Sequence, residues 1–189
     1  MLALGTPAPD FALPDITGRK VSLRNAADNA QATVIVFMCN HCPYVKHLKT
    51  ELSRFARTYQ ARGVTIIGIN SNDVATHPED GSAQMARDSE TFGYVFPYLF
   101  DADQSVAKAY HAACTPDFYV FDVNLVLAYR GQFDDSRPGN NKTVNGSDLS
   151  AAVDALLYQR PIPSEQTPSI GCNIKWRPGN EPDYFSQQT

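Results

Sequence analysis

The sequence has no long apolar run, no block of charges of one sign and no internal repeat. A helix that crosses a bilayer needs about 20 consecutive apolar residues, so a membrane-spanning protein is not expected. The 16 Lys and Arg and the 20 Asp and Glu residues are scattered along the chain, with a formal net charge of −4. We therefore expect no basic face for nucleic acid or for a membrane. A hydrophobic fraction of 43% is typical of a globular protein and argues against disorder.

Cysteine is scarce, with four residues in a chain of 189. The first residues, 1–7, show neither the basic segment nor the apolar run of a secretory signal, so the cytoplasm is the expected location. Thiols stay reduced there, so four cysteines indicate catalysis or metal binding more than structural disulfides. The length fits one domain with some excess at one end.

A buried strand leads into a cysteine at the start of a helix. The apolar, β-branched residues over 32–38 predict a strand covered on both faces. Apolar residues then recur at helical spacing and predict a helix over 43–61, with a stripe formed by Val45, Leu48, Leu52, Phe55 and Tyr59. Pro43 suits the first helical position, where its missing N–H costs nothing, and this places Cys42 at the N-cap.

A sulfur at the N-cap faces the free N–H groups and the positive end of the helix dipole. Thiols placed this way have pKa values lowered from about 8.5 to roughly 3.5–7.5. We therefore predict that Cys42 is the nucleophilic thiolate of a redox site. Cys39 lies three residues earlier at the strand end, and the sequence leaves it open between a second site residue and a packing residue.

Short strands alternate with helices along the rest of the chain. The pattern predicts a hairpin from 11–13 and 21–23, strands at 64–69, 98–100, 117–122 and 125–130, and helices near 80–92, 103–112 and after an N-cap at Ser147. This order predicts an α/β fold in which a mixed central sheet is flanked by helices, with an N-terminal β-hairpin extension. The loop over 132–146 is long for a compact domain, and it either borders a site or is a surface excursion.

The last segment, 160–189, contains five prolines and lacks helical or strand periodicity. It is predicted to be a tail that lies over the preceding domain. Ile170, Ile174 and Trp176 are expected to dock it, and Cys172 lies among them.

Three motifs resemble the thioredoxin-like superfamily: residues 5–13, the strand that runs into His41-Cys42-Pro43, and Thr115-Pro116-Asp117. Within it they are similar to the redoxin branch that includes the alkyl hydroperoxide reductase and thiol-specific antioxidant (AhpC/TSA) proteins, over about residues 5–158. The tail resembles that of a peroxiredoxin-like subgroup. The resemblance implies a thioredoxin-like domain over 1–159 followed by a tail over 160–189. It also implies that Pro116 is a cis-proline that, with Thr115, faces Cys42.

Two departures from these families bear on the activity. Thioredoxins carry a second cysteine three residues after the first, a position held here by Val45. Peroxiredoxins position the peroxide with a proline and a threonine before the cysteine, and these places hold Ile35 and Cys39. The expected function is that of a thiol-disulfide oxidoreductase, a peroxiredoxin-like antioxidant protein with weak peroxidase activity. Its partners would be protein or small thiols and disulfides, with peroxides secondary.

Cys42 then needs another thiol to release a mixed disulfide. Cys172 on the tail is the first candidate. Cys39 is the second, since a tight turn could bring its Cα atom and that of Cys42 within the roughly 4.4–6.8 Å separation that is usual in disulfides. Cys114, two residues before the expected cis-proline, is the third. His41 either adds positive charge and carries a proton beside Cys42 or is a solvated turn residue.

Two other functions stay open. Cys39, His41, Cys42 and Cys114 would form a soft ligand set for copper(I), zinc or an iron–sulfur cluster, which makes a metal- or cluster-binding module the first alternative. A redox-inert fold retained for partner binding is the second, and Val45 favours it. For the oxidoreductase we expect no cofactor, and a homodimer stays open.

Overall fold

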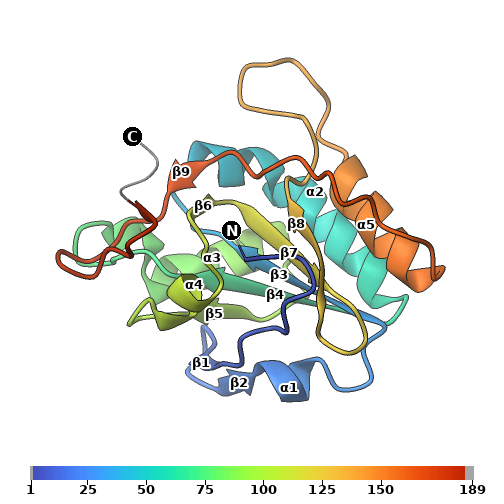
Figure 1. The fold of residues 1–189 in the computed structure, drawn as a ribbon. Coiled ribbons are helices and arrows are strands. Elements are labelled where there is room, and N and C mark those ends of the chain that lie inside the picture. The colour runs from blue at the N-terminus through green and yellow to red at the C-terminus, as the bar shows by residue number, and fades with distance from the viewer. Residues whose placement is uncertain (1, 186–189) are drawn as a thin grey trace.

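The computed structural model describes residues 2–185 of the chain. Its central sheet is built from β3 (Ala32–Phe37), β4 (Val64–Asn70), β5 (Tyr98–Phe100), β7 (Asp117–Phe121) and β8 (Leu127–Gly131). The strand order is β5-β4-β3-β7-β8. Strands β3, β4 and β5 are parallel, whereas β7 runs antiparallel to both β3 and β8 (Figure 1). The mixed central sheet is therefore confirmed.

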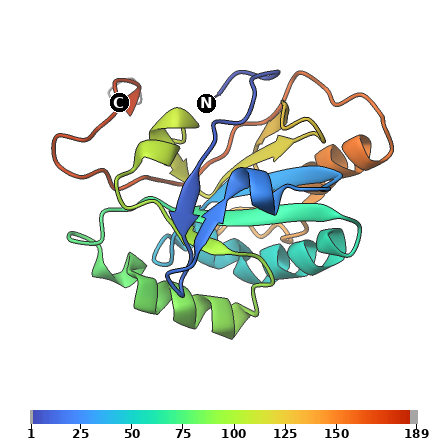
Figure 2. The same ribbon diagram turned by 90° about the horizontal axis from the view of Figure 1, so that it is seen from below.

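Helices cover both faces of this sheet, as expected. One apolar core lies against α2 (Pro43–Gln60), α3 (Ser82–Phe92) and α5 (Ser147–Leu157). The other core lies against α1 (Leu23–Ala26) and α4 (Ser105–Ala109). Figure 2 shows the sheet between these layers, with the hairpin of β1 (Ala12–Pro14) and β2 (Lys20–Ser22) beside β5.

Strand β3 is buried over its whole length because alternate side chains enter different cores. Val34 and Val36 pack toward α2, while Ile35 and Phe37 pack on the opposite face. The expected apolar stripe of α2 is also buried from Val45 to Tyr59. These two elements hold the segment between them, residues 38–42, at the end of β3 that faces the helix N-terminus.

The helix expected near 80–92 is confirmed as α3, and a separate 3₁₀ turn, Pro78–Asp80, precedes it because Gly81 is extended. Two other helix boundaries differ. The helix expected near 103–112 is shorter, because His111 takes a left-handed backbone conformation with φ 51° just beyond it. Ser147 is the first helical residue of α5 rather than its N-cap, which is Gly146 with φ 64°.

A further sheet of two strands, besides the β1–β2 hairpin, was not predicted. It pairs β6 (Cys114–Thr115) antiparallel with β9 (Cys172–Asn173), which belongs to the tail. The tail runs from α5 along β8 to β6 (Figure 1). None of the helices in the described part of the chain combines the length and apolar character needed to cross a bilayer.

Candidate active site

Cys42 lies at the N-cap of α2, directly before Pro43, as the sequence predicts. Its side chain is completely buried. Cys39, at the end of β3, is 1% exposed and lies close enough to hydrogen-bond the Cys42 sulfur. The structure therefore assigns Cys39 to the site.

The peptide bond between Thr115 and Pro116 is cis, as the resemblance implied. Cys42 Sγ lies 3.2 Å from the Thr115 carbonyl oxygen, to which the protonated form of Cys42 donates a hydrogen bond. The Thr115 hydroxyl lies 3.3 Å from the Cys39 sulfur. Thr115 therefore contacts both sulfurs, one through its backbone and one through its side chain.

The environment gives the two sulfurs opposite charge preferences. The hydrogen bond from Cys39 lowers the pKa of Cys42, helped by the Val45 N–H and by Cys172, and these effects outweigh burial. The same hydrogen bond, together with burial and the negative charge of Asp80, raises the pKa of Cys39. These directions favour a pair in which the last proton stays on Cys39 and Cys42 is the thiolate.

Asp80 is a site residue that the sequence analysis missed. Its side chain is fully buried, and Oδ1 accepts hydrogen bonds from the N–H groups of Asn40 (2.8 Å) and His41 (3.2 Å). Oδ2 lies 2.6 Å from His41 Nδ1 and accepts a hydrogen bond from Asn72. The available signal was an acid in the loop that follows the buried strand β4. The sequence did not connect that loop with residues 39–42.

Asn40 fastens the loop between the two cysteines from the other side. Its carbonyl oxygen accepts a hydrogen bond from Lys49 Nζ at 3.1 Å, and Lys49 is buried in an ion pair with Asp88. Its side-chain oxygen accepts one from the Tyr98 hydroxyl at 3.1 Å. With Asp80 holding its N–H, Asn40 has little freedom, so the separation of the two sulfurs is preorganised.

The tail crosses the site as strand β9, with Cys172 opposite Thr115 in the antiparallel register. Cys172 reaches the Cys42 sulfur with both its backbone and its side chain. The crossing is close, because a Cβ placed on Gly171 would lie 2.0 Å from the Thr115 carbonyl oxygen. Segment 170–173 is called the strap below.

The strap is anchored on both sides. Before it, the Ser169 hydroxyl donates to the Gly131 carbonyl oxygen at 2.6 Å. After it, Ile174 and Trp176 are buried in the core on the α4 face, as expected. The predicted docking of Ile170 is wrong, since this side chain is 52% exposed. Cys172 is therefore held beside Cys42 rather than carried there by a loose segment.

Cys114 does not join the other three cysteines. It lies opposite Asn173 in the small sheet, and side chains of neighbouring strand residues point to opposite faces. Thr115 and Cys172 therefore face Cys42, while Cys114 faces away. Burial, followed by the charge of Asp117, raises the pKa of Cys114 and keeps it a thiol.

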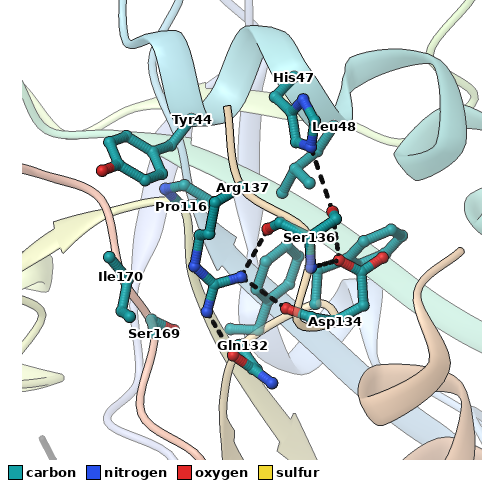
Figure 3. A pocket seen from close by; sticks show the side chains of 12 residues that line it. Tyr44, His47, Leu48, Pro116, Gln132, Asp134, Ser136, Arg137, Ser169 and Ile170 are labelled. Carbon is teal, nitrogen blue, oxygen red and sulfur yellow. Dashed lines mark hydrogen bonds between the residues drawn. The ribbon is translucent and has the colours of Figure 1, made fainter. Parts of the chain in front are cut away.

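A small cavity of about 20 Å³ borders the site (Figure 3). Tyr44, Pro116 and Ile170 line it on the side of the strap. The long loop over 132–146 supplies the other wall, where Arg137 donates hydrogen bonds to the carbonyl oxygens of Asp134 and Ser136. The loop therefore borders the site, and the cavity has room for about one water molecule.

The peroxide-positioning groups of peroxiredoxins are not reproduced around Cys42. Ile35 is buried in the core on the opposite face of the sheet from α2. Cys39 supplies a thiol where those proteins would place a hydroxyl, and this thiol is directed at Cys42 and Thr115.

The architecture and the cis-proline opposite a helix-capping cysteine define a thioredoxin-like protein. A solved thioredoxin domain of a thiol-disulfide oxidoreductase from Bacteroides vulgatus superposes with a TM-score of 0.62 at 16% identity, covering 81% of this chain and 99% of that one. The chain belongs to the AhpC/TSA family, whose model matches residues 4–130.

Two further proteins are similar in sequence. A solved structure of an uncharacterised conserved protein from Geobacillus kaustophilus is 54% identical, with a TM-score of 0.91, and 94% of each chain is covered. The thiol-disulfide oxidoreductase ResA of Geobacillus thermodenitrificans is 26% identical over 123 residues, which is 65% of this chain. The chain spans 66% of that relative's own length, just under two thirds.

Proposed function

We propose that the protein is a thiol-disulfide oxidoreductase in which Cys42 is the nucleophilic thiolate. The observation that carries this proposal is the hydrogen bond from Cys39, which lowers the pKa of a cysteine at the N-terminus of α2. The thiolate is the form that attacks disulfides. The similarity to ResA, named as a thiol-disulfide oxidoreductase, supports the same chemistry.

The first step forms a mixed disulfide. The Cys42 thiolate attacks one sulfur of a substrate disulfide, the substrate S–S bond breaks, and the leaving thiolate takes a proton from solvent. Cys39 stays protonated and loses its hydrogen-bond acceptor when Cys42 becomes bonded to sulfur. The negative charge that Cys42 imposes on its neighbours disappears at the same moment.

The second step uses Cys172. In the reduced protein, burial and the nearby Cys42 raise the pKa of Cys172 to about 11. Formation of the mixed disulfide removes the charge on Cys42, so Cys172 loses its proton to solvent more readily. Its thiolate then attacks Cys42 Sγ, a Cys42–Cys172 disulfide forms, and the substrate leaves as a thiol. An external thiol would reduce this disulfide and close the cycle.

The proposed partners are protein or small disulfides and thiols in a reducing compartment, the cytoplasm. Peroxides are proposed as poor oxidants, because the site offers Cys42 no hydroxyl comparable to the missing threonine. A peroxiredoxin-like antioxidant role would then rest on exchange with disulfides rather than on direct peroxide reduction.

Intact-mass analysis after treatment with oxidised glutathione tests the proposal. We expect a glutathione adduct that proceeds to an intramolecular disulfide in the parent protein, and neither product in Cys42→Ser. Cys114→Ser is the matched control and should behave like the parent. Adduct formation at an unchanged rate in Cys42→Ser would show that Cys42 is not the nucleophile.

A further inference from the structure

A second group of donor atoms lies beside the two sulfurs, on residues 39–41 and the loop that follows β4. The ligand atoms of Cys39, His41 and Asp80 all lie within 4.8 Å of one another. Cys39 Sγ and His41 Nδ1 are 3.9 Å apart, and His41 Nδ1 and Asp80 Oδ2 are 2.6 Å apart. The oxidoreductase steps above use only the Cys39 member of this group.

The donor set is one that zinc accepts: a thiolate, an imidazole nitrogen and a carboxylate oxygen. With Zn–S near 2.3 Å and Zn–N near 2.05 Å, the sulfur and nitrogen of a tetrahedral site lie about 3.6 Å apart. The Cys39 and His41 atoms are already close to that separation. The ligand atoms of His41 and Asp80 need to move only slightly further apart, because the metal ion takes the place of the proton between them.

Cys42 lies outside this group, so three protein ligands would leave one coordination position of a zinc ion open. The surroundings also orient the ligands. Asp80 is fixed through Oδ1 by the N–H groups of Asn40 and His41 and through Oδ2 by the amide of Asn72. Partners of this kind set ligand orientation in metal sites, and their loss typically lowers metal affinity about 10–100-fold.

We propose that Cys39, His41 and Asp80 bind a zinc ion in the reduced protein. The site differs from the ligand set expected from the sequence, because Asp80 takes the place of Cys42 and Cys114. Zinc on Cys39 would displace the proton that this thiol donates to Cys42 in the proposed exchange, so the zinc-bound form lacks that hydrogen bond.

Zinc titration of the reduced protein tests this proposal without any oxidant, so the result does not depend on the proposed redox activity. Zinc chloride is added to protein reduced with a phosphine and followed by calorimetry and by competition with a chromogenic chelator. We expect one zinc per chain and an affinity that rises with pH, because the Cys39 proton is displaced.

Variants identify the ligands. His41→Ala, Asp80→Asn and Cys39→Ser should each weaken zinc binding about tenfold or more. His47→Ala, a histidine further along α2, and Cys172→Ser should not weaken it. Because Asp80 also holds the loop, thermal melting must show that Asp80→Asn is folded. His41→Ala gives an independent answer, because the side chain of His41 is 21% exposed.

Two results would overturn the proposal. The first is the absence of saturable zinc binding by the reduced parent protein. The second is loss of binding in Cys172→Ser while His41→Ala and Asp80→Asn still bind, which would assign the metal to a site made of sulfurs under the strap.

Discussion

At the scale of single residues, the groups that surround each sulfur determine the charge preference of Cys39 and of Cys42. Asp80 is fully buried and places a negative charge near Cys39. Cys42 instead meets the Val45 N–H at the start of α2. In the proposed mechanism, this asymmetry makes Cys42 the nucleophile and Cys39 its hydrogen-bond donor.

The pH dependence of iodoacetamide alkylation measures this asymmetry. Only the thiolate reacts, so the alkylation rate at Cys42 should fall as the pH drops through its lowered pKa. The rate should already reach its plateau below about pH 8.5, the usual pKa of a free thiol. Cys39→Ala removes the donor. A hydrogen bond to a charged group is worth about 1.5–3 kcal/mol, so the midpoint should rise by roughly one to two pH units.

Cys114→Ala is the control for this series, because Cys114 points away from Cys42. In this variant the pH midpoint of Cys42 alkylation should equal that of the parent protein. A parent midpoint at or above about 8.5 would remove the basis for a thiolate at Cys42. An unchanged midpoint in Cys39→Ala would assign the lowered pKa to the helix N-terminus and Cys172.

At the scale of elements, the sequence predicted what is local and missed what is paired over a distance. The run over 32–38, Pro43 and the stripe from Val45 onward each specify their own element, so β3, α2 and the position of Cys42 were predictable. Nothing local in Cys172–Asn173 marks a strand, since its partner is 58 residues earlier at Cys114–Thr115. Asp80 was missed for the same reason, as its contacts reach back to Asn40.

The strap makes Cys172 the expected resolving residue. Cys172→Ser should leave Cys42 trapped as a mixed disulfide after treatment with a disulfide, because no other thiol in the small sheet faces Cys42. Peptide mapping under non-reducing conditions should show a Cys42–Cys172 link in the parent and none in the variant. A Cys39–Cys42 link, or unaltered turnover in Cys172→Ser, would show that Cys39 resolves the mixed disulfide. The role of the strap would then be structural.

Gly171→Ala tests how the strap is held. The new Cβ would lie 2.0 Å from the Thr115 carbonyl oxygen, so backbone must move and the pairing of β6 with β9 should open. We expect a stability loss of about 1–3 kcal/mol, typical of overpacking, together with faster alkylation of Cys42. Asn173→Ala, an exposed change in the same strap, is the control. Equal alkylation rates in both variants would mean that the strap does not cover Cys42.

At the scale of the whole molecule, the site is assembled from parts that are far apart in the chain. Residues 38–42 follow β3, Asp80 follows β4, Thr115 and Pro116 precede β7, and the strap comes from the tail. This arrangement encloses Cys42 completely and offers it thiols, a carbonyl oxygen and backbone N–H groups. Such surroundings suit sulfur–sulfur exchange better than stabilisation of a developing charge on peroxide oxygen.

We therefore expect Cys42 to react readily with disulfides and only modestly with hydrogen peroxide. A preorganised donor to a developing oxyanion is typically worth about 10²–10³ in rate, and the missing threonine would have been one. Stopped-flow rates with hydrogen peroxide and with a small disulfide at the same pH compare the two. Cys39→Thr places the hydroxyl at that position and should raise the peroxide rate relative to the disulfide rate. A parent peroxide rate that matches or exceeds the disulfide rate would contradict this ordering.

The strap follows α5 in the chain, and this order fixes when the site is completed during translation. At about 5–20 residues per second, the 16 residues from 158 to 173 take roughly 1–3 s to synthesise after α5 has been made. The sheet and α2 precede the tail and are ready to fold first, so the nascent chain passes through a stage in which Cys42 is present but uncovered. The newborn protein is then the form most open to large disulfide partners. A ribosome stalled before residue 170 would display that form.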